Sequence, residues 1–415
     1  MNNYNFSELS NGIQVVTENI PYLKSFSLGF WYKVGTRDEN EKINGISHFL
    51  EHMLFKGTTK RSARKISEDI ESCGGYLNAF TSKEHTCIYG RGLGENLEKT
   101  FAILSDMVQN PLLKDSHIKK EAGVIIDELN DINDNPEELI FDKIEEVLFK
   151  GNTLSYPIIG TEKNILNINN SNLMKYHSSH YRSDNLLISA SGDLKHEQIV
   201  KLVEKYFRES AGSNKRLHKF LESSYPKEVT IDKDINQVHS ILGKRIPGFD
   251  DPGRVKYQLL SSLLGESSSS RLFQAVREKL GITYQINSFL NSYQDISVFG
   301  VYFSTNDKQS EKVQSIIFKE FQKLRENKIS EKELNRTKEY LIGSIILGLE
   351  STNNRMMRMA NSILYFNKII TIEEQIERIK SVTAQDLIEV SEWILNQDDY
   401  SRIFVRSNNK AKNAA

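Results

Sequence analysis

The order of apolar and polar residues along the chain predicts alternating strands and helices. Segments rich in β-branched and aromatic residues predict strands at residues 25–35, 76–92, 185–194, 237–246 and 282–305. Segments with apolar residues three and four positions apart predict helices at residues 45–55, 63–74, 95–111, 171–181, 255–265, 268–281 and 310–327. This mixture predicts an α+β fold in which helices pack on mixed sheets.

The order of the predicted elements in the first half of the chain recurs in the second half. Each half holds a strand, two helices, a further strand region and an amphipathic helix, in that order. Sequence identity between the halves is faint, so the repeat rests on this order alone. We predict two homologous halves resembling α/β sandwiches, each a mixed sheet with helices on one side.

A polar and irregular segment separates the two predicted halves. Residues 209–226, ESAGSNKRLHKFLESSYP, end in proline and lack a regular apolar period. This composition is typical of a linker. The predicted domains are therefore residues 1–208 and 227–415.

The predicted helix GISHFLEHMLF at residues 45–55 carries three polar side chains on one arc. At about 100° per residue, His48, Glu51 and His52 lie on the same face, while apolar residues cover most of the rest. Two histidines at positions i and i+4 present ring nitrogens to one point, as zinc requires. Glu51 can then take a proton from a zinc-bound water.

Two observations bear on this interpretation. The alternative is that the histidines are hydrogen-bonded core residues and that Glu51 is a surface residue, but the apolar neighbours disfavour a solvated Glu51. In the second half the corresponding stretch is Gln258-Leu-Leu-Ser-Ser262, which has no such groups. We therefore expect only the first half to hold the chemistry.

The predicted helix SHIKKEAGVIIDELNDI at residues 116–132 carries a candidate third ligand. Glu121 and Glu128 are seven positions apart, two helical turns, and both lie in the apolar sector of this helix. Two carboxylates that point into a core need a cation or a strong hydrogen-bonding partner. The alternative is that they pair with lysine or arginine from another helix.

Composition and termini limit the class of protein. The 54 basic and 55 acidic residues nearly cancel, so no charge excess indicates a nucleic-acid or membrane partner. The first residues, MNNYNFSELSNG, lack the features of a secretory signal, and the longest apolar runs are too short to span a bilayer. Two cysteines cannot form a disulfide framework. We predict a soluble, cytoplasmic protein.

The motif H-x-x-E-H followed 76 positions later (128 − 52) by a glutamate resembles the inverzincin metallopeptidases. These are the pitrilysin, insulysin and mitochondrial-processing-peptidase group, here in the short bacterial form. The resemblance covers nearly the whole chain. It is carried by LSNGIQVVTENI, GISHFLEHMLFKGT, GGYLNAFTSKEHT, EAGVIIDEL and SSSRLFQAVREKLGITYQI.

The resemblance implies a role for each residue of the predicted zinc site. It implies that His48, His52 and Glu128 bind one zinc ion per subunit, and that Glu51 is the general base. It also implies that Glu121 supports the catalytic site from behind the ligands. The first predicted domain would be the zinc-binding, catalytic half.

The resemblance also implies substrate-binding residues in both halves. Asn78, Ala79 and Phe80 match an edge strand that accepts an extended peptide by β-augmentation. Arg277 and Tyr284 match residues of the second half that bind substrate and, for Tyr284, stabilise the intermediate. Taken without the resemblance, Asn78 is better read as a turn residue and Phe80 as a core residue. A helix-end role for Arg277 and a packing role for Tyr284 are about as well supported as binding roles.

These inferences predict a zinc metalloendopeptidase that cleaves unfolded peptides or extended segments with a metal-activated water. The resemblance implies that the chain is half of a clam-shell chamber and forms a homodimer, with a heterodimer with a related chain as the alternative. The alternative function is a non-catalytic scaffold or chaperone-like subunit of the same family. We expect no nucleic-acid or membrane partner.

Overall fold

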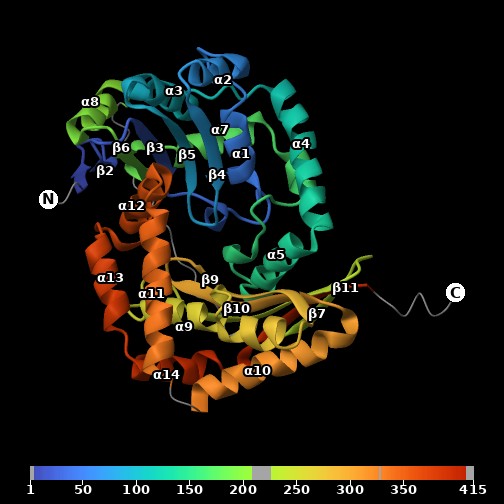
Figure 1. The fold of residues 1–415 in the computed structure, drawn as a ribbon. Helices are drawn as coiled ribbons and strands as arrows, with labels where there is room; N and C mark the ends of the chain where they lie inside the picture. Colours follow the sequence, from blue (N-terminus) through green and yellow to red (C-terminus); the bar gives the residue numbers. More distant parts are fainter. Residues whose placement is uncertain (1–3, 208–225, 327–328, 408–415) are drawn as a thin grey trace. The chain divides into compact units, whose positions relative to one another are not determined.

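The chain forms two compact units, each built around one sheet (Figure 1). The computed structural model describes residues 4–207, 226–326 and 329–407. The first unit contains Met1–Asp131, Asn152–Phe220 and Gly348–Ile370. The second unit contains Ile132–Gly151, Leu221–Leu347 and Thr371–Ala415. Neither unit is therefore continuous in sequence.

The first unit has a six-stranded sheet in the order β1-β2-β6-β3-β5-β4. Strands β2 and β6 are parallel, and the other neighbouring strands are antiparallel. The strands are β1 (Tyr4–Glu8), β2 (Gln14–Asn19), β3 (Ser25–Tyr32), β4 (Tyr76–Thr81), β5 (Thr86–Leu93) and β6 (Leu186–Gly192). The helices are α1 (Ile46–Leu54), α2 (Ala63–Glu71), α3 (Leu97–Gln109), α4 (Asp115–Asp134, whose last residues belong to the second unit), α6 (Glu162–Asn167), α7 (Asn170–His180), α8 (His196–Tyr206) and α12 (Thr352–Phe366).

The second unit has a five-stranded sheet in the order β7-β11-β8-β10-β9. Strands β7 and β11 are parallel, and the other neighbouring strands are antiparallel. The strands are β7 (Glu228–Asp232), β8 (Val238–Pro247), β9 (Thr283–Ser292), β10 (Ile296–Thr305) and β11 (Ser401–Arg406). The helices are α5 (Pro136–Leu148), α9 (Arg254–Ser261), α10 (Ser310–Glu326), α11 (Glu331–Gly348), α13 (Ile372–Ser381) and α14 (Ala384–Ile394), with π-helical turns at Ser262–Glu266 and Phe273–Glu278.

The two sheets repeat the same topology. The order β2-β6-β3-β5-β4 recurs as β7-β11-β8-β10-β9, and the single parallel pair lies at the same place in both. Strand β1 is an addition to the first sheet. The repeat of strand order and pairing sense confirms the prediction of two homologous halves with mixed sheets.

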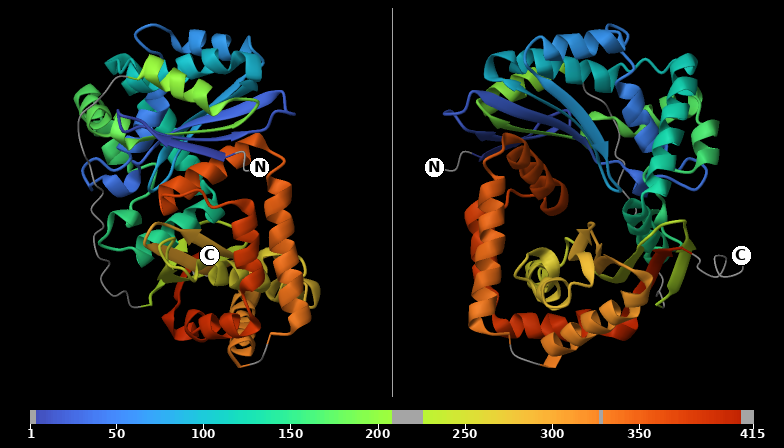
Figure 2. Two further views of the ribbon diagram at one scale, coloured as in Figure 1. Left: turned by 90° about the vertical axis from the view of Figure 1, so that its left-hand side faces the viewer. Right: turned by 45° about the vertical axis from the view of Figure 1, so that its right-hand side comes forward.

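Both faces of the first sheet are covered, and one face is covered by a helix from a distant part of the chain. Neighbouring residues of a strand point to opposite faces. Phe30 of β3 contacts Phe101 of α3, whereas the next residue, Trp31, packs in a cluster with Met356 of α12. The first half's own helix thus covers one face, as predicted, and α12 covers the other (Figures 1 and 2).

The second sheet shows the reciprocal arrangement. Tyr302 of β10 contacts Phe141 of α5, which comes from the first half of the chain. The next residue, Phe303, packs in the core cluster with Phe321 of α10. Each sheet therefore receives one helix from the other half of the chain.

The predicted helices and strands are present in the described residues, and other predictions stay open. The predicted linker lies, except for Pro226, outside the described residues, so the division by chain order stays a prediction. The exchange of α5 and α12 nevertheless means that the compact units differ from the predicted domains. Among the helices of the described residues, none combines the length and the apolar character that a membrane span requires.

Candidate metal centre

Helix α1 is a buried helix with one polar face. Its apolar residues Phe49, Leu50, Met53 and Leu54 are fully buried, which confirms the periodicity prediction. His48 and Glu51 are also buried, at 9% and 8% exposure. The rings of His48 and His52 lie with their centroids 4.5 Å apart. The helix therefore presents two imidazoles and a carboxylate from the same face.

Helix α4 places Glu128 beside both histidines. Glu128 Oε1 lies 3.7 Å from His48 Nε2, and Glu128 Oε2 lies 3.5 Å from His52 Nε2. A zinc ion bound tetrahedrally at about 2.0–2.1 Å separates its ligand atoms by roughly 3.4 Å. One ligand atom from each residue lies within 4.8 Å of the other two. The three residues thus fit a zinc ion, and their role as ligands stays a prediction.

The two glutamates of α4 differ in exposure. The side chain of Glu121 is 4% exposed, as the apolar sector predicts, but that of Glu128 is 43% exposed. The expectation that both carboxylates point into a core was therefore wrong for Glu128. A partly open ligand leaves solvent access to the site, which a catalytic metal needs for its remaining coordination position.

Glu121 orients His52 through the ring nitrogen that faces away from Glu128. Its Oε1 lies 2.9 Å from His52 Nδ1, so Nε2 of the same ring is the atom that faces Glu128. Its Oε2 forms an ion pair with Lys56 Nζ at 2.7 Å. A carboxylate of this kind fixes the tautomer and the aim of a ligating histidine. Sequence reasoning missed Lys56, although its position four residues after His52 could have indicated it.

Glu51 is held by the edge strand. The Thr81 hydroxyl at the end of β4 donates to Glu51 Oε2 at 2.6 Å. Burial raises the pKa of Glu51, and the Thr81 hydrogen bond opposes that rise. Burial, with a smaller contribution from His52, lowers the pKa of His48 to about 3. His48 is therefore neutral, as a metal ligand must be. Sequence reasoning also missed Thr81.

The predicted substrate strand is an edge of the first sheet. Strand β4 pairs with β5 and is the last strand in the sheet order. Asn78 and Phe80 point to the face that α12 covers, since Phe80 contacts Trp31. Ala79 points to the same face as Thr81 and thus toward α1. The edge position is what β-augmentation requires, and the role of these residues stays a prediction.

Arg277 and Tyr284 lie together in the second unit. The Arg277 guanidinium stacks 5.0 Å from the Tyr284 ring and 4.8 Å from the Phe273 ring. Tyr284 is 76% exposed. A stacked arginine beside an open phenol is suited to binding a polar ligand. Their predicted roles are untested.

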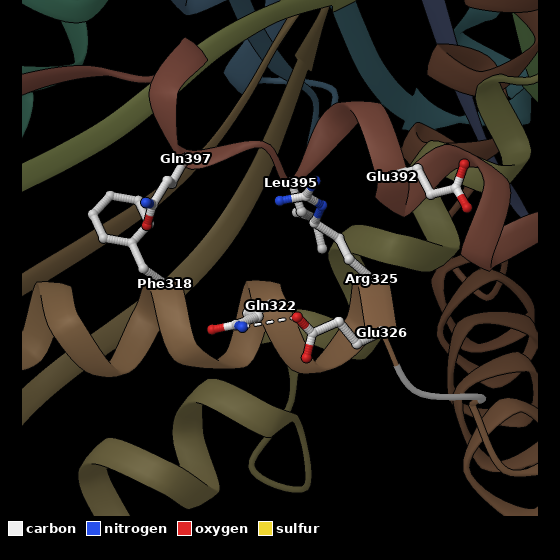
Figure 3. Close-up of a pocket in the computed structure, with 7 residues that line it drawn as sticks. All are labelled: Phe318, Gln322, Arg325, Glu326, Glu392, Leu395 and Gln397. Atoms are coloured by element: carbon white, nitrogen blue, oxygen red, sulfur yellow. Dashed lines mark hydrogen bonds between the residues drawn. The ribbon is translucent and has the colours of Figure 1, made fainter.

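A polar hollow in the second unit offers no comparable chemistry. It has a volume of about 580 Å³ and lies between α10 and α14 (Figure 3). In it the Gln322 amide donates to Glu326 at 2.8 Å. The hollow is lined by Phe318, Gln322, Arg325, Glu326, Glu392, Leu395 and Gln397. It contains none of the predicted site residues.

Two protein-family profiles match most of the chain. The profile described as insulinase (peptidase family M16) matches residues 14–162. The profile described as the peptidase M16 inactive domain matches residues 167–341. The match boundaries place His48, Glu51, His52 and Glu128 in the first of these regions.

Relatives over the full length carry a consistent name. A Bacillus subtilis protein named "Uncharacterized zinc protease YmxG" is 34% identical over 390 residues, 94% of this chain and 95% of that protein. A Rickettsia felis protein named "Uncharacterized zinc protease" is 36% identical over 403 residues, 97% of each chain. The crystal structure of a protease from Helicobacter pylori shares the fold, with a TM-score of 0.91 at 23% identity over 97% of this chain and 99% of that one. Sequence and fold together show that the chain belongs to the insulinase (M16) family of peptidases, in which its relatives are named zinc proteases.

Proposed function

We propose that the protein is a zinc-dependent endopeptidase that cleaves unfolded peptides or extended segments. The observation that carries this proposal is the convergence of His48, His52 and Glu128 from two helices, with Glu51 on the same face of α1. The names of the relatives support a zinc protease.

Each residue of the centre has an assigned task. His48, His52 and Glu128 would hold the metal, with His48 and His52 offering Nε2 and Glu128 a carboxylate oxygen. When bound, zinc lowers the pKa of a water to about 7 and polarises the substrate carbonyl. Glu51 would accept a proton from the attacking water and return it to the leaving amine. Because Oε2 is bonded to Thr81, we assign this proton transfer to Glu51 Oε1.

The substrate is bound as an added strand. An extended peptide at the edge of β4 would form backbone hydrogen bonds that tolerate many side chains. Asn78, Ala79 and Phe80 would contact it there. Arg277 and Tyr284 would bind the substrate as well, with Tyr284 donating to the developing oxyanion. We expect Tyr284→Phe to lower kcat and Arg277→Ala chiefly to raise KM.

The alternative function is a non-catalytic scaffold or chaperone-like subunit of the same family. The match of the second half to a domain described as inactive keeps this alternative in view. The complete set of His48, Glu51, His52 and Glu128 favours the enzyme, because a scaffold has no need of it.

One experiment separates the two functions. The purified protein is incubated with an unstructured peptide, with and without a chelator, and after zinc is added back. An enzyme loses cleavage with chelator and regains it with zinc. Glu51→Gln should abolish cleavage but retain zinc, whereas Glu68→Gln, an exposed glutamate of α2 paired with Arg64, should change neither. Cleavage that is absent in the wild-type protein, or unchanged in Glu51→Gln, would contradict the proposal.

We further propose that the protein acts as a homodimer in the cytoplasm. The presence of both the zinc motif and the Arg277–Tyr284 pair in one chain supports a homodimer over a pair with a related chain. The mass of the purified protein in solution tests this directly. A monomer at micromolar concentration would contradict it.

A further inference from the structure

The start of helix α1 is buried and cannot be capped by its own N-cap side chain. The N-cap residue is Gly45, whose φ of 97° lies in the left-handed region. A Cβ at this position would approach the Ile159 carbonyl oxygen to 2.7 Å, so a serine, threonine or aspartate does not fit. The first N–H groups of α1 therefore need an acceptor from elsewhere in the chain.

The carboxylate of Glu39 supplies that acceptor. Its Oε1 accepts from the Ser47 N–H at 2.8 Å, and its Oε2 accepts from the Gly45 N–H at 2.8 Å. The Asn44 side-chain amide also donates to Oε2, at 3.0 Å. Glu39 is 4% exposed. A buried carboxylate thus satisfies two backbone donors at the positive end of the helix dipole.

Further contacts hold the same turn in place. The Asn44 side chain also donates to the Pro157 carbonyl at 2.9 Å, and the Ser47 hydroxyl lies 2.7 Å from the Tyr176 hydroxyl. Ser47 directly precedes His48. The backbone that carries His48 is therefore fixed from the loop before α1 and from α7.

The two histidines of the centre are oriented by different means. His52 has Glu121 at its second ring nitrogen. The Nδ1 atom of His48 is buried and has no hydrogen-bond partner among the described residues. No polar contact at Nδ1 fixes the aim of the His48 ring, so this aim depends on packing and on the backbone turn from which His48 extends.

We propose that Glu39 is a positioning residue of the metal centre, which fixes through the backbone the histidine that no side chain orients. It does for His48 what Glu121 does for His52. Its negative charge also offsets the positive helix end, which would otherwise disfavour a cation bound at the first turn. This inference rests on the proposed zinc site.

The second unit provides a matched control. Helix α9 follows the N-cap residue Gly253, and the Asp251 Oδ1 atom accepts from the Gly253 N–H at 2.6 Å and from the Tyr257 hydroxyl at 3.0 Å. An acidic side chain thus holds the turn before the equivalent helix, where the second half has no metal motif. Loss of this carboxylate changes helix stability without a route to a zinc ligand.

The test measures zinc affinity by chelator competition in Glu39→Ala, Glu39→Gln and Asp251→Ala. Measurements at pH 8 lie above the pKa of about 7 to which burial raises the Glu39 carboxyl. Loss of a residue that orients a ligand typically weakens metal affinity about 10- to 100-fold. We expect a loss of that size in Glu39→Ala, a smaller loss in the isosteric Glu39→Gln, and wild-type affinity in Asp251→Ala. The visible spectrum of the cobalt-substituted protein should shift in the Glu39 variants alone.

The outcomes are distinguishable. If wild type binds zinc and a folded Glu39→Ala or Glu39→Gln variant binds it equally well, the inference is overturned and the proposed function stands. An equal loss of affinity in Asp251→Ala would reduce Glu39 to a structural cap and also overturn it. If wild type binds no zinc, the proposed function fails and the inference fails with it. Should Glu39→Ala not fold, Glu39→Gln decides.

Discussion

Helices α1 and α9 pack against corresponding strands of the two sheets, but their polar side chains differ. Helix α1 lies in the chain between β3 and β4, α9 lies between β8 and β9, and each contacts its edge strand. In the first unit the polar contact between them joins Glu51 and Thr81. In the second, the Ser288 hydroxyl donates to the Ser261 carbonyl at 2.6 Å. In both units a helix therefore packs on the edge strand, with Glu51 and Thr81 in contact in the first unit and Ser261 and Ser288 in the second.

The same contrast holds for the helix that precedes each exchanged helix. Glu121 and Glu128 of α4 stand 15 and 8 positions before the first residue of α5 (136 − 121; 136 − 128). Thr337 and Ser344 of α11 stand 15 and 8 positions before the first residue of α12 (352 − 337; 352 − 344). Carboxylates therefore occur at these two distances from the following helix in the first half only. The metal centre depends on side chains that the second half lacks.

Removal of a proposed ligand should have the largest effect. We expect His48→Ala to lose zinc, from about one ion per chain to nearly none, together with peptide cleavage, because two ligands bind zinc weakly. Gln258→Ala, in the stretch of α9 that the sequence comparison sets against His48–His52, should keep both. Metal analysis after gel filtration measures the difference. Equal zinc content in the two variants would contradict the claim that only the first half binds zinc.

Replacement of a buried side chain of the exchanged helix α12 should have the next largest effect. Met356 is fully buried against the first sheet, so Met356→Ala should lower the free energy of unfolding by about 2–5 kcal/mol. Phe141 of α5 is only half-buried on the second sheet, and Phe141→Ala should cost less. Urea denaturation of the two variants compares them. A larger loss in Phe141→Ala would show that burial does not rank the two exchanged helices.

Loss of the carboxylate behind His52 should weaken zinc binding without abolishing it. We expect Glu121→Gln to reduce zinc affinity about 10- to 100-fold, since His52 loses the group that orients it. Lys56→Ala should have a smaller effect in the same direction. Thr337→Val, at the same distance before the next helix in the second half, should leave zinc affinity unchanged. Chelator competition gives all three values, and wild-type affinity in Glu121→Gln would exclude this role.

Removal of the Thr81 hydroxyl should shift a pH profile by a small amount. The Thr81 hydrogen bond lowers the pKa of Glu51, so Thr81→Val should raise that pKa further. Because the base must be ionised, the acidic limb of kcat/KM should move to higher pH. One hydrogen bond of about 1 kcal/mol corresponds to a shift of roughly 0.7 pH unit. Ser288→Ala should not move the limb, and a shift to lower pH in Thr81→Val would contradict the assignment.

The sequence predicted the parts of the site that depend on local spacing. His48, Glu51 and His52 lie within one short helix, so helical periodicity alone places them on one face. Glu128 required the seven-residue spacing to Glu121 and the resemblance to a family, because its approach to His52 is a contact between distant segments. The periodicity of α4 predicted that Glu128 is buried, but its side chain is 43% exposed. The apolar pattern of a helix shows which face is covered, but not how far along the helix the neighbouring elements cover it.

Other features depend on tertiary contacts that no local pattern contains. Thr81 reaches Glu51 because the end of β4 lies beside α1, and Glu39 reaches α1 from a loop six residues upstream of Gly45. The exchange of α5 and α12 joins segments that are far along the chain from the strands they cover, by 90 residues between α5 and β8 (238 − 148) and by 160 between β6 and α12 (352 − 192). The order of elements predicted two sheets, but not which helix covers which face.

The central claim is tested most directly by a crystal of the zinc-loaded protein with data collected at the zinc absorption edge. We expect a single anomalous peak in each chain, about 2.0–2.2 Å from His48 Nε2, His52 Nε2 and a Glu128 carboxylate oxygen. The equivalent position beside Gln258 should show none. A peak elsewhere, or none beside His48 and His52, would contradict the account.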